Sequence, residues 1–329
     1  MLPSLARINA TTPAPPLTSV SHPPLDLAIN SGDDAAAAAP PFGWPLGPQA
    51  LLEPLPAPLE RALAEVLQAL ARWPRVVVAY SGGVDSTLVA ALAVSVLGER
   101  AEAITGVSPA LAPHLRREAR EQARWLGIRQ REVPTAELAD PAYASNPVDR
   151  CYACKRELHR LLAPIAAAAG GAQVLDGVNH DDLRDHRPGI QAAREAGVVS
   201  PLAEAGVNKE QVRQLSRALG LPWWDKPAQP CLASRFPYGD AITASRLERV
   251  AAAEDWLRRQ GFKALRVRSQ GETARLELPS QDLAAALERL AAGPLRQELV
   301  TTFRGLGFTA VALDLEGLVS GKLNRGLGA

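Results

Sequence analysis

The sequence predicts an α/β protein, with a doubly wound parallel sheet followed by a smaller α+β domain. In residues 75–90 an apolar, β-branched run breaks at Gly82-Gly83 and resumes as an Ala/Leu/Val-rich helical pattern. A buried parallel strand leading into a helix has this pattern. Strand-length and helix-length patterns then alternate to about residue 220, which is typical of a parallel sheet with helices on its faces. From Thr243 onward the pattern changes, and closely spaced strands follow a helix.

Composition and pattern divide the chain into three parts. Residues 1–48 are rich in Pro, Ala, Ser and Thr without apolar periodicity, and we predict a disordered extension there. Residues 49–240 are predicted to form the parallel-sheet domain, with helices at 58–73, 114–126, 151–169 and 208–219 and later strands at 101–107, 129–133 and 173–176. Residues 241–329 are predicted to form an α+β domain for substrate binding or oligomerisation, with helices at 243–260 and 280–292 and strands at 262–268, 273–278 and 308–313.

Composition limits the class of partner and the compartment. The net charge of +1 gives no reason to expect a nucleic-acid or membrane-surface partner. No apolar run approaches the roughly 20 residues that span a bilayer. Three cysteines, an odd number, argue against a disulfide framework and favour a reducing cytoplasm. The first 25 residues carry no acidic side chain, which leaves a transit peptide as the alternative.

The glycine-containing turn predicts an anion site. Backbone N–H groups at a helix N-terminus bind phosphate, and Gly82 and Gly83 let the backbone approach it closely. Ser81, Ser86 and Thr87 add hydroxyl groups. No lysine follows the glycines, so the turn is not the Gly-x-x-x-x-Gly-Lys loop of the common nucleotide hydrolases. Asp85 beside a triphosphate implies a cation between them, and we predict that it binds magnesium. A strand-to-helix turn without a ligand is the simpler alternative.

Two further loops are rich in polar side chains. Residues 177–189 follow a predicted sheet strand and carry several carboxylates, so Asn179 and Asp182 are candidates for metal or ribose contacts. A solvated acidic loop is the alternative. Residues 223–239 contain three prolines, Cys231, cationic side chains and aromatic residues, a combination that suggests an active-site loop.

Arginines cluster on the predicted strands of the second domain. Arg266 and Arg268 alternate with apolar residues and therefore share one face, and Arg275 lies on the neighbouring strand. Such a set could bind a phosphate or a carboxylate through bidentate hydrogen bonds. An ordinary solvated sheet face is the alternative.

The cysteines are Cys151, Cys154 and Cys231. The first two form a Cys-x-x-Cys at a helix start, where the helix dipole and neighbouring cations are expected to favour thiolate. A structural zinc normally needs four ligands, and His159 is the only nearby fourth candidate. A thioredoxin-like dithiol would need no third cysteine. Three thiolates can hold a 4Fe-4S cluster with one iron open, and unrelated buried thiols remain the plain alternative.

Taken together, these motifs resemble those of the LarE family of PP-loop ATP pyrophosphatases. The resemblance implies that the parallel-sheet domain has the fold of the adenine nucleotide alpha hydrolases. The resemblance covers residues from about 50 to the C-terminus. It rests on residues 81–86, Gly106-Val107-Ser108-Pro109, Asp149-Arg150-Cys151-Tyr152 with Cys154-Lys155, Asp176-Gly177 with Asn179, Asp181-Asp182, Arg187-Pro188-Gly189, Ser200-Pro201-Leu202, Lys226-Pro227, Cys231-Leu232-Ala233-Ser234-Arg235, and Leu313-Asp314-Leu315-Glu316-Gly317.

The resemblance implies an ATP-dependent sulfur transferase. Members of this family adenylate a carboxylate of pyridinium-3,5-biscarboxylic acid mononucleotide and replace AMP with sulfur, during assembly of the nickel-pincer cofactor of lactate racemase. The chemistry is coherent, because a carboxylate oxygen leaves poorly whereas AMP leaves well and sulfur is a strong nucleophile. ATP with Mg²⁺ is the implied cofactor, and a homo-oligomer is one option for the assembled enzyme.

The same resemblance implies residue roles. In this family, members with one cysteine sacrifice the sulfur of the residue equivalent to Cys231, whereas the resemblance implies a 4Fe-4S cluster that carries an extra sulfide in members with all three. We therefore expect the cluster type. Arg266 and Arg268 become candidates for the substrate phosphate, and Glu254 and Asp314 for a cation or the substrate. Ser234 and Arg235 are expected to orient the substrate beside Cys231.

Other enzyme classes fit parts of this pattern. A PP-loop tRNA thiolase also combines this loop with a three-cysteine cluster, but it should present a basic surface, which the +1 charge does not favour. An amide-forming PP-loop ligase or a non-catalytic ATP-binding module would not need three cysteines.

Overall fold

The computed structural model describes residues 51–184, 187–291, 293–319 and 321–327. The predicted extension at residues 1–48 lies outside the described residues. No helix within these ranges is long and apolar enough to cross a membrane.

A four-stranded parallel sheet forms the first part of the described chain. Its strands are β1 (Val76–Ala79), β2 (Ala101–Val107), β3 (Arg129–Pro134) and β4 (Gln173–Leu175), in the order β3-β2-β1-β4. Every pair is parallel, with Val76 opposite Ala101 on one side and Gln173 on the other. The chain therefore moves outward from β1 to β3 and then crosses to the far side of β1 with β4.

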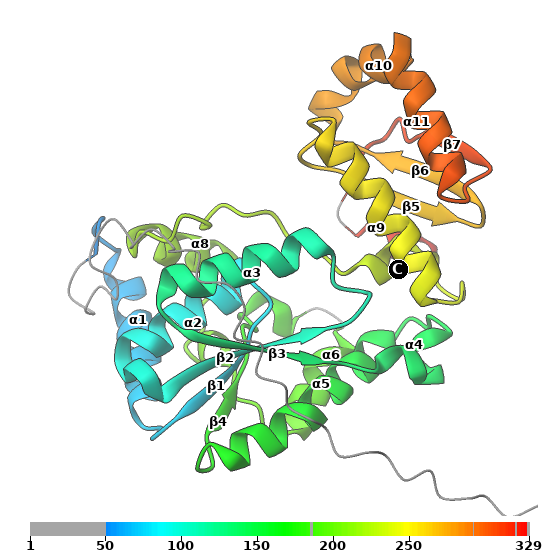
Figure 1. The fold of residues 1–329 in the computed structure, drawn as a ribbon. Helices are drawn as coiled ribbons and strands as arrows, with labels where there is room; N and C mark the ends of the chain where they lie inside the picture. Colours follow the sequence, from blue (N-terminus) through cyan, green and yellow to red (C-terminus); the bar gives the residue numbers. More distant parts are fainter. Residues whose placement is uncertain (1–50, 185–186, 292, 320, 328–329) are drawn as a thin grey trace, which may run out of the picture. The chain divides into compact units, whose positions relative to one another are not determined.

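Helices cover both faces of this sheet (Figure 1). They are α1 (Ala57–Ala71), α2 (Val84–Leu97), α3 (Pro113–Leu126), α4 (Pro141–Ala144), α5 (Arg150–Ala168), α6 (Pro188–Glu195), α7 (Pro201–Glu204) and α8 (Lys209–Ala218). Val76 and Val78 belong to an apolar cluster that includes residues of α1, α2, α3 and α8, whereas Val77 and Ala79 belong to a second cluster that includes residues of α5. Because successive strand residues point to opposite faces, this division makes β1 the buried centre of the sheet and explains its continuous apolar run.

The second part contains a small mixed sheet. Strands β5 (Arg266–Gln270) and β6 (Thr273–Glu277) are antiparallel, and β7 (Ala310–Leu313) is parallel to β6. Helices α9 (Ala244–Arg259), α10 (Leu283–Ala291) and α11 (Gly293–Gly305) accompany the sheet. Its apolar core includes Leu247 and Val250 of α9 and Phe303 of α11. Trp256 meets Phe303 edge to face at 6.0 Å between ring centroids, a favoured aromatic geometry.

The predicted fold class is confirmed, and most predicted elements lie within a few residues of the observed ones. The sequence reasoning missed α6 and α11, as well as two four-residue helices. The predicted strand 262–268 begins only at Arg266 and extends to Gln270. Gly261 follows α9 and Gly271 lies between β5 and β6. Both have positive φ and form turns that the hydrophobic pattern alone did not indicate.

Candidate functional site

The topology places two loops together at the centre of the parallel sheet. Strand order reverses at β1, with β2 on one side and β4 on the other. In open parallel sheets, ligands bind outside the carboxyl ends of the strands at such a reversal. The loop after β1 is the glycine turn 80–83, and the loop after β4 begins at Asp176-Gly177. The predicted anion loop and the predicted polar loop therefore meet at this point.

The glycine turn has the geometry that phosphate binding requires. Gly82 has φ of +70°, and a Cβ there would lie 2.9 Å from Cβ of Ala119. Gly83 is the extended residue before α2, so the first N–H groups of that helix remain available to an anion. The hydroxyls of Ser81 and Ser86 lie 3.1 Å apart and hold the turn together. Thr87, by contrast, is buried, and its hydroxyl donates to Oε1 of Gln122 at 3.2 Å.

The two loops are in direct backbone contact. A Cβ added to Gly177 would lie 2.6 Å from the backbone N of Ser86 and 2.8 Å from its Cα. No side chain could move to relieve such an overlap. A glycine is therefore required at position 177 for the loop after β4 to approach the first turn of α2.

We expect Gly177→Ala to destabilise the fold by about 1–3 kcal/mol, the usual cost of overpacking, and to weaken ATP binding because α2 must shift. Urea titration and calorimetric ATP titration would measure both effects. Gly305→Ala is the matched control, because nothing lies within 4 Å of the added atom there. Equal behaviour of the two variants would contradict this account of the contact.

Charged side chains gather beside the glycine turn. Oδ2 of Asp85 lies 2.5 Å from Nζ of Lys209, and its Oδ1 accepts a hydrogen bond from Nδ2 of Asn179 at 3.2 Å. Nζ of Lys226 donates to the carbonyl of Gly82 at 2.9 Å and pairs with Glu118 at 2.7 Å. Lys209 was missed by the sequence reasoning, because no local motif marks a lysine 124 residues from its partner.

Asp182 holds the second loop in place. Its carboxylate accepts the backbone N–H of Asn179 at 3.1 Å and pairs with Arg187 at 2.7 Å. Burial raises the pKa of Asp182, and the nearby charge of Asp85 adds to this effect, whereas the Asn179 N–H and Arg187 oppose it. Asp182 thus lies near Asp85 and Asn179, with its carboxylate engaged by the protein.

These donors are compatible with magnesium. Within the described ranges, no group of three or more His, Cys, Asp or Glu side chains could hold a metal ion. Magnesium is usually bound by one or two carboxylates together with water and substrate phosphates, so a single Asp85 next to a phosphate cradle is a suitable donor set.

The three cysteines lie near one another without forming a closed metal site. Cys151 and Cys231 are exposed and Cys154 is half-buried. The sequence reasoning expected the helix dipole and neighbouring cations to favour thiolate here, whereas burial acts in the opposite direction at Cys151 and Cys154. Desolvation raises the pKa of Cys154 to about 12, helped by the negative charges of Glu137 and the other cysteines. Desolvation by the protein atoms around its thiol also raises the pKa of Cys151, and Cys231 adds to this effect.

Buried polar atoms without hydrogen-bond partners lie close to these thiols. Tyr143 Oη, Glu137 Oε2, and Nε and Nη1 of Arg150 are buried and have no partner among the described residues. Tyr143 packs in the same core cluster as Leu232, next to Cys231, and Cys154 lies against that cluster. Buried polar groups are normally satisfied, so these atoms retain hydrogen-bonding capacity that the described residues do not use.

Four of the remaining predicted residues, Ser234, Arg235, Glu254 and Arg268, belong to a network of buried ion pairs. Arg235 pairs with the fully buried Glu254 at 2.8 Å, and Arg268 pairs with the fully buried Glu277 at 2.9 Å. Ser234 connects the two pairs, because its hydroxyl accepts from Nη1 of Arg235 and its carbonyl accepts from Nη1 of Arg268.

The predicted cation ligands of the second domain are already engaged. The carboxylate of Glu254 also accepts from Arg258 and from the Val267 N–H. Asp314 is paired with Lys322 at 2.6 Å and with Arg275 at 3.3 Å. Both carboxylates therefore serve as counter-ions to protein cations in this structure, a role that sequence position alone did not indicate.

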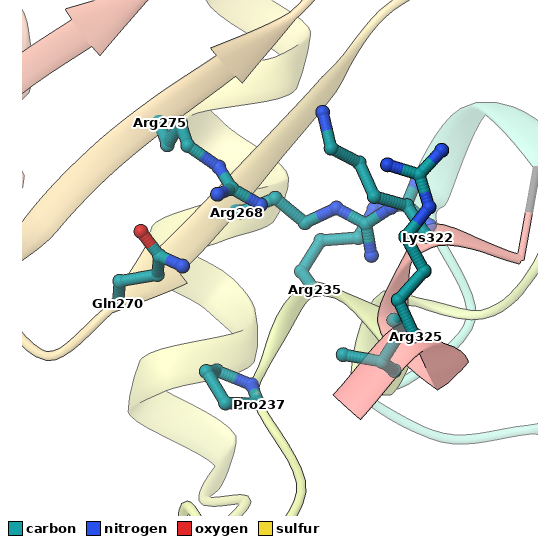
Figure 2. Close-up of a pocket in the computed structure, with 8 residues that line it drawn as sticks. Arg235, Pro237, Arg268, Gln270, Arg275, Lys322 and Arg325 are labelled. Carbon is teal, nitrogen blue, oxygen red and sulfur yellow. The ribbon is translucent and has the colours of Figure 1, made fainter. Parts of the chain in front are cut away.

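A cationic pocket of about 280 Å³ adjoins this network. Figure 2 shows its labelled side chains, which come from the Cys231 loop, β5, β6 and the C-terminal turn η6 (Lys322–Leu327). Its cationic lining residues are Arg235, Arg268, Arg275, Lys322 and Arg325. Arg266 is half-buried outside this lining, and its guanidinium has no ion-pair partner within the described ranges.

Comparisons with known proteins agree with this geometry. Residues 58–147 match the NAD synthase family. The chain is 38% identical over 262 residues to the pyridinium-3,5-bisthiocarboxylic acid mononucleotide synthase of Lactiplantibacillus plantarum, which covers 79% of this chain and 93% of that protein. It is 55% identical over 267 residues to an uncharacterized protein of Synechocystis sp., covering 81% and 98% respectively. It is 26% identical over 244 residues to an uncharacterized protein of Methanocaldococcus jannaschii, covering 74% and 90%.

The site and these similarities identify an ATP-utilising enzyme with a PP-loop domain. The similarity to the Lactiplantibacillus synthase extends over most of both chains and reaches well beyond the ATP-binding domain. The chain belongs to the LarE family of pyridinium-3,5-bisthiocarboxylic acid mononucleotide synthases.

Proposed function

We propose that this enzyme uses ATP to transfer sulfur to a carboxylate of pyridinium-3,5-biscarboxylic acid mononucleotide for nickel-pincer cofactor assembly. The observation that carries the proposal is the hydrogen bond from Nζ of Lys226 to the carbonyl of Gly82, at 2.9 Å. Lys226 belongs to the loop that carries Cys231. This contact ties the cysteine loop to the ATP loop, so an activated substrate and a sulfur source can share one site.

In the first step, a substrate carboxylate oxygen attacks the α-phosphorus of ATP and pyrophosphate leaves. The N–H groups at the start of α2 bind the departing pyrophosphate, and Lys209 and Lys226 offset its developing charge. Magnesium, when bound, would neutralise further phosphate charge, and Asp85 would hold it, oriented by Asn179. Ser81 and Ser86 shape the turn around the phosphates.

In the second step, a sulfur nucleophile attacks the acyl carbon and the carbon–oxygen bond to AMP breaks. The product is a thiocarboxylate, and AMP carries away the electron pair of the broken bond. We propose that Cys231 delivers or holds this sulfur, that Ser234 and Arg235 position the substrate beside it, and that Arg266 and Arg268 attract the substrate phosphate. Residues 49–240 would bind ATP, and residues 241–329 would bind the substrate. Three free thiols suit a cytoplasmic enzyme.

We further propose that Cys151, Cys154 and Cys231 hold a 4Fe-4S cluster. Such a cluster, held by three thiolates, would supply an open iron for an extra sulfide. The donor chemistry fits. Arg150, Lys155 and Arg187 place positive charge near Cys151, and the free N–H groups of Arg150 and the hydroxyl of Tyr143 could donate to anionic sulfur. Glu254 and Asp314 are weaker candidates for a cation, because protein cations already engage them.

Anaerobic purification followed by iron and sulfide analysis tests the cluster. We expect about four irons and at least about four sulfides per chain, with an absorbance that disappears in Cys151→Ser. Tyr143→Phe is expected to keep the iron and change the cluster's resonance Raman Fe–S frequencies. If anaerobic protein, even after reconstitution with iron and sulfide, contains no iron, the cluster assignment is wrong and a sacrificial Cys231 would be the remaining sulfur source.

A further inference from the structure

The cationic pocket contains two kinds of arginine. Arg235 and Arg268 are engaged mostly by the protein itself. Arg235 donates from all three nitrogens, with Nε and Nη2 to Glu254 and Nη1 to the Pro230 carbonyl at 2.9 Å. Arg268 donates to Glu277 from Nε and to the Ser234 carbonyl from Nη1. Both side chains are nearly buried, so they contribute positive potential to the pocket but few free N–H groups.

The ammonium of Lys322 is also engaged. Its Nζ lies 2.6 Å from Asp314, 3.2 Å from Glu316 and 3.2 Å from the Gly317 carbonyl. Three donors and three acceptors satisfy the group completely. Lys322 therefore fixes the C-terminal turn to the loop after β7 and adds charge to the pocket without offering it a free donor.

Arg275 and Arg325 differ from these three cations. Arg275 uses Nη2 on Glu277, and Arg325 uses Nη1 on Glu316 at 2.8 Å. Nη1 of Arg275 and both Nε and Nη2 of Arg325 have no hydrogen-bond partner in the described part of the chain. Arg275 is held by Glu277 through Nη2 and by Asp314 through Nε, whereas Arg325 is held by Glu316 alone through Nη1. Both guanidinium groups line the pocket (Figure 2). The amide of Gln270 adds another unengaged donor among the residues that the structure describes.

We propose that Arg325, on the C-terminal turn, and Arg275, on β6, bind the phosphate monoester of the mononucleotide substrate directly. Arg235, Arg268 and Lys322 then act as positioning cations. This inference rests on the proposed function and extends it. The sequence led us to expect phosphate contacts from Arg266 and Arg268 of β5, whereas here Arg275 of β6 and Arg325 of the C-terminal turn make the direct contacts.

The chemistry of the pocket favours this ligand. A phosphate monoester carries between one and two negative charges at pH 7 and offers several oxygens to two guanidinium edges. The pocket of about 280 Å³ is at the lower limit of ligand pockets, roughly 300 Å³, so it suits one end of a ligand. Nη1 of Arg235 also lies 3.3 Å from the Cys231 carbonyl, so a phosphate held here is anchored next to the sulfur-bearing loop.

Calorimetric titration of the full chain with nicotinic acid mononucleotide and with its riboside, which lacks the phosphate, tests the proposal. We expect Arg325→Gln to weaken mononucleotide binding at least about tenfold, the usual effect of losing a charge-assisted hydrogen bond. Arg325→Lys should lie between Arg325→Gln and the wild type, since it keeps the charge but loses the planar fork. Riboside and ATP affinities should not change, and a purely structural role would not produce this selectivity.

Arg296→Gln, at an exposed position on α11, is the matched control and should bind every ligand like the wild type. The proposal is overturned if Arg325→Gln binds the mononucleotide as tightly as the wild type, or if the mononucleotide and riboside bind equally well. It is also overturned if only RNA occupies the pocket, with steep salt dependence. Absence of thiocarboxylate formation would refute the proposed function and would leave Arg325-dependent phosphate binding unaffected.

Discussion

Replacing Cys231 with serine is expected to abolish thiocarboxylate formation while adenylation of the substrate continues. The hydroxyl of serine can neither donate sulfur nor act as a soft ligand to iron. The adenylation machinery lies on other residues, at the glycine turn and Lys209. Cys231 is exposed and its side chain makes no hydrogen bond in the described structure, so the variant is expected to fold normally.

Two measurements separate the two half-reactions. Exchange of labelled pyrophosphate into ATP, dependent on the pyridinium carboxylate, reports adenylation and should stay within about twofold of the wild type. Mass spectrometry of the product reports sulfur transfer and should show none. Thiocarboxylate formation by Cys231→Ser at the wild-type rate would remove Cys231 from the mechanism. Loss of exchange as well would mean that the cysteine loop is needed to form the ATP site.

Replacing Asp85 with asparagine is expected to slow pyrophosphate release by about 100-fold or more. Loss of a group that stabilises transition-state charge typically has an effect of this size. The amide cannot bind magnesium with a full charge, and Lys209 loses the carboxylate that holds it 2.5 Å away. The variant should also need a higher magnesium concentration for half-maximal rate, whereas its thermal stability should change little because Asp85 is partly exposed.

Asp255→Asn serves as the control for charge removal. Asp255 forms an exposed pair with Arg259 on α9, and such pairs contribute little to stability. Its magnesium dependence should equal that of the wild type. If Asp85→Asn released pyrophosphate at the wild-type rate and with unchanged magnesium dependence, neither Asp85 nor its contact with Lys209 would belong to the ATP site.

The parallel sheet and the ATP loop could be predicted from the sequence because their signals are local. The β1 run, Gly82 and the start of the following helix lie within residues 75–90, and each has a distinct physical requirement. The alternation of strands and helices then brings the loops after β1 and β4 to the same edge. Asn179 and Asp182 could be named as candidates for metal or ribose contacts from their place after a sheet strand, but the contact between Asn179 and Asp85, 94 residues apart, is visible only in the fold.

The ion-pair partners could not be predicted, because they depend on long-range packing. Helical spacing places Glu254 on the buried stripe of α9 with Val250 and Leu257, but nothing in the sequence identifies Arg235 as its partner. The effect of burial on the pKa of Cys154 could not be predicted for a related reason. The helix start and its cations are visible in the sequence, but the desolvation that raises the pKa of Cys154 comes from residues packed around it in the fold.

The most direct test of the account is to incubate the anaerobically purified enzyme with ATP, magnesium and pyridinium-3,5-biscarboxylic acid mononucleotide, and then to record the mass of the nucleotide product. We predict replacement of one carboxylate oxygen by sulfur, with one AMP formed for each sulfur transferred. An unchanged nucleotide mass with active, ATP-binding protein would contradict the account, and thiolation of added tRNA under the same conditions would assign the sulfur to a different acceptor.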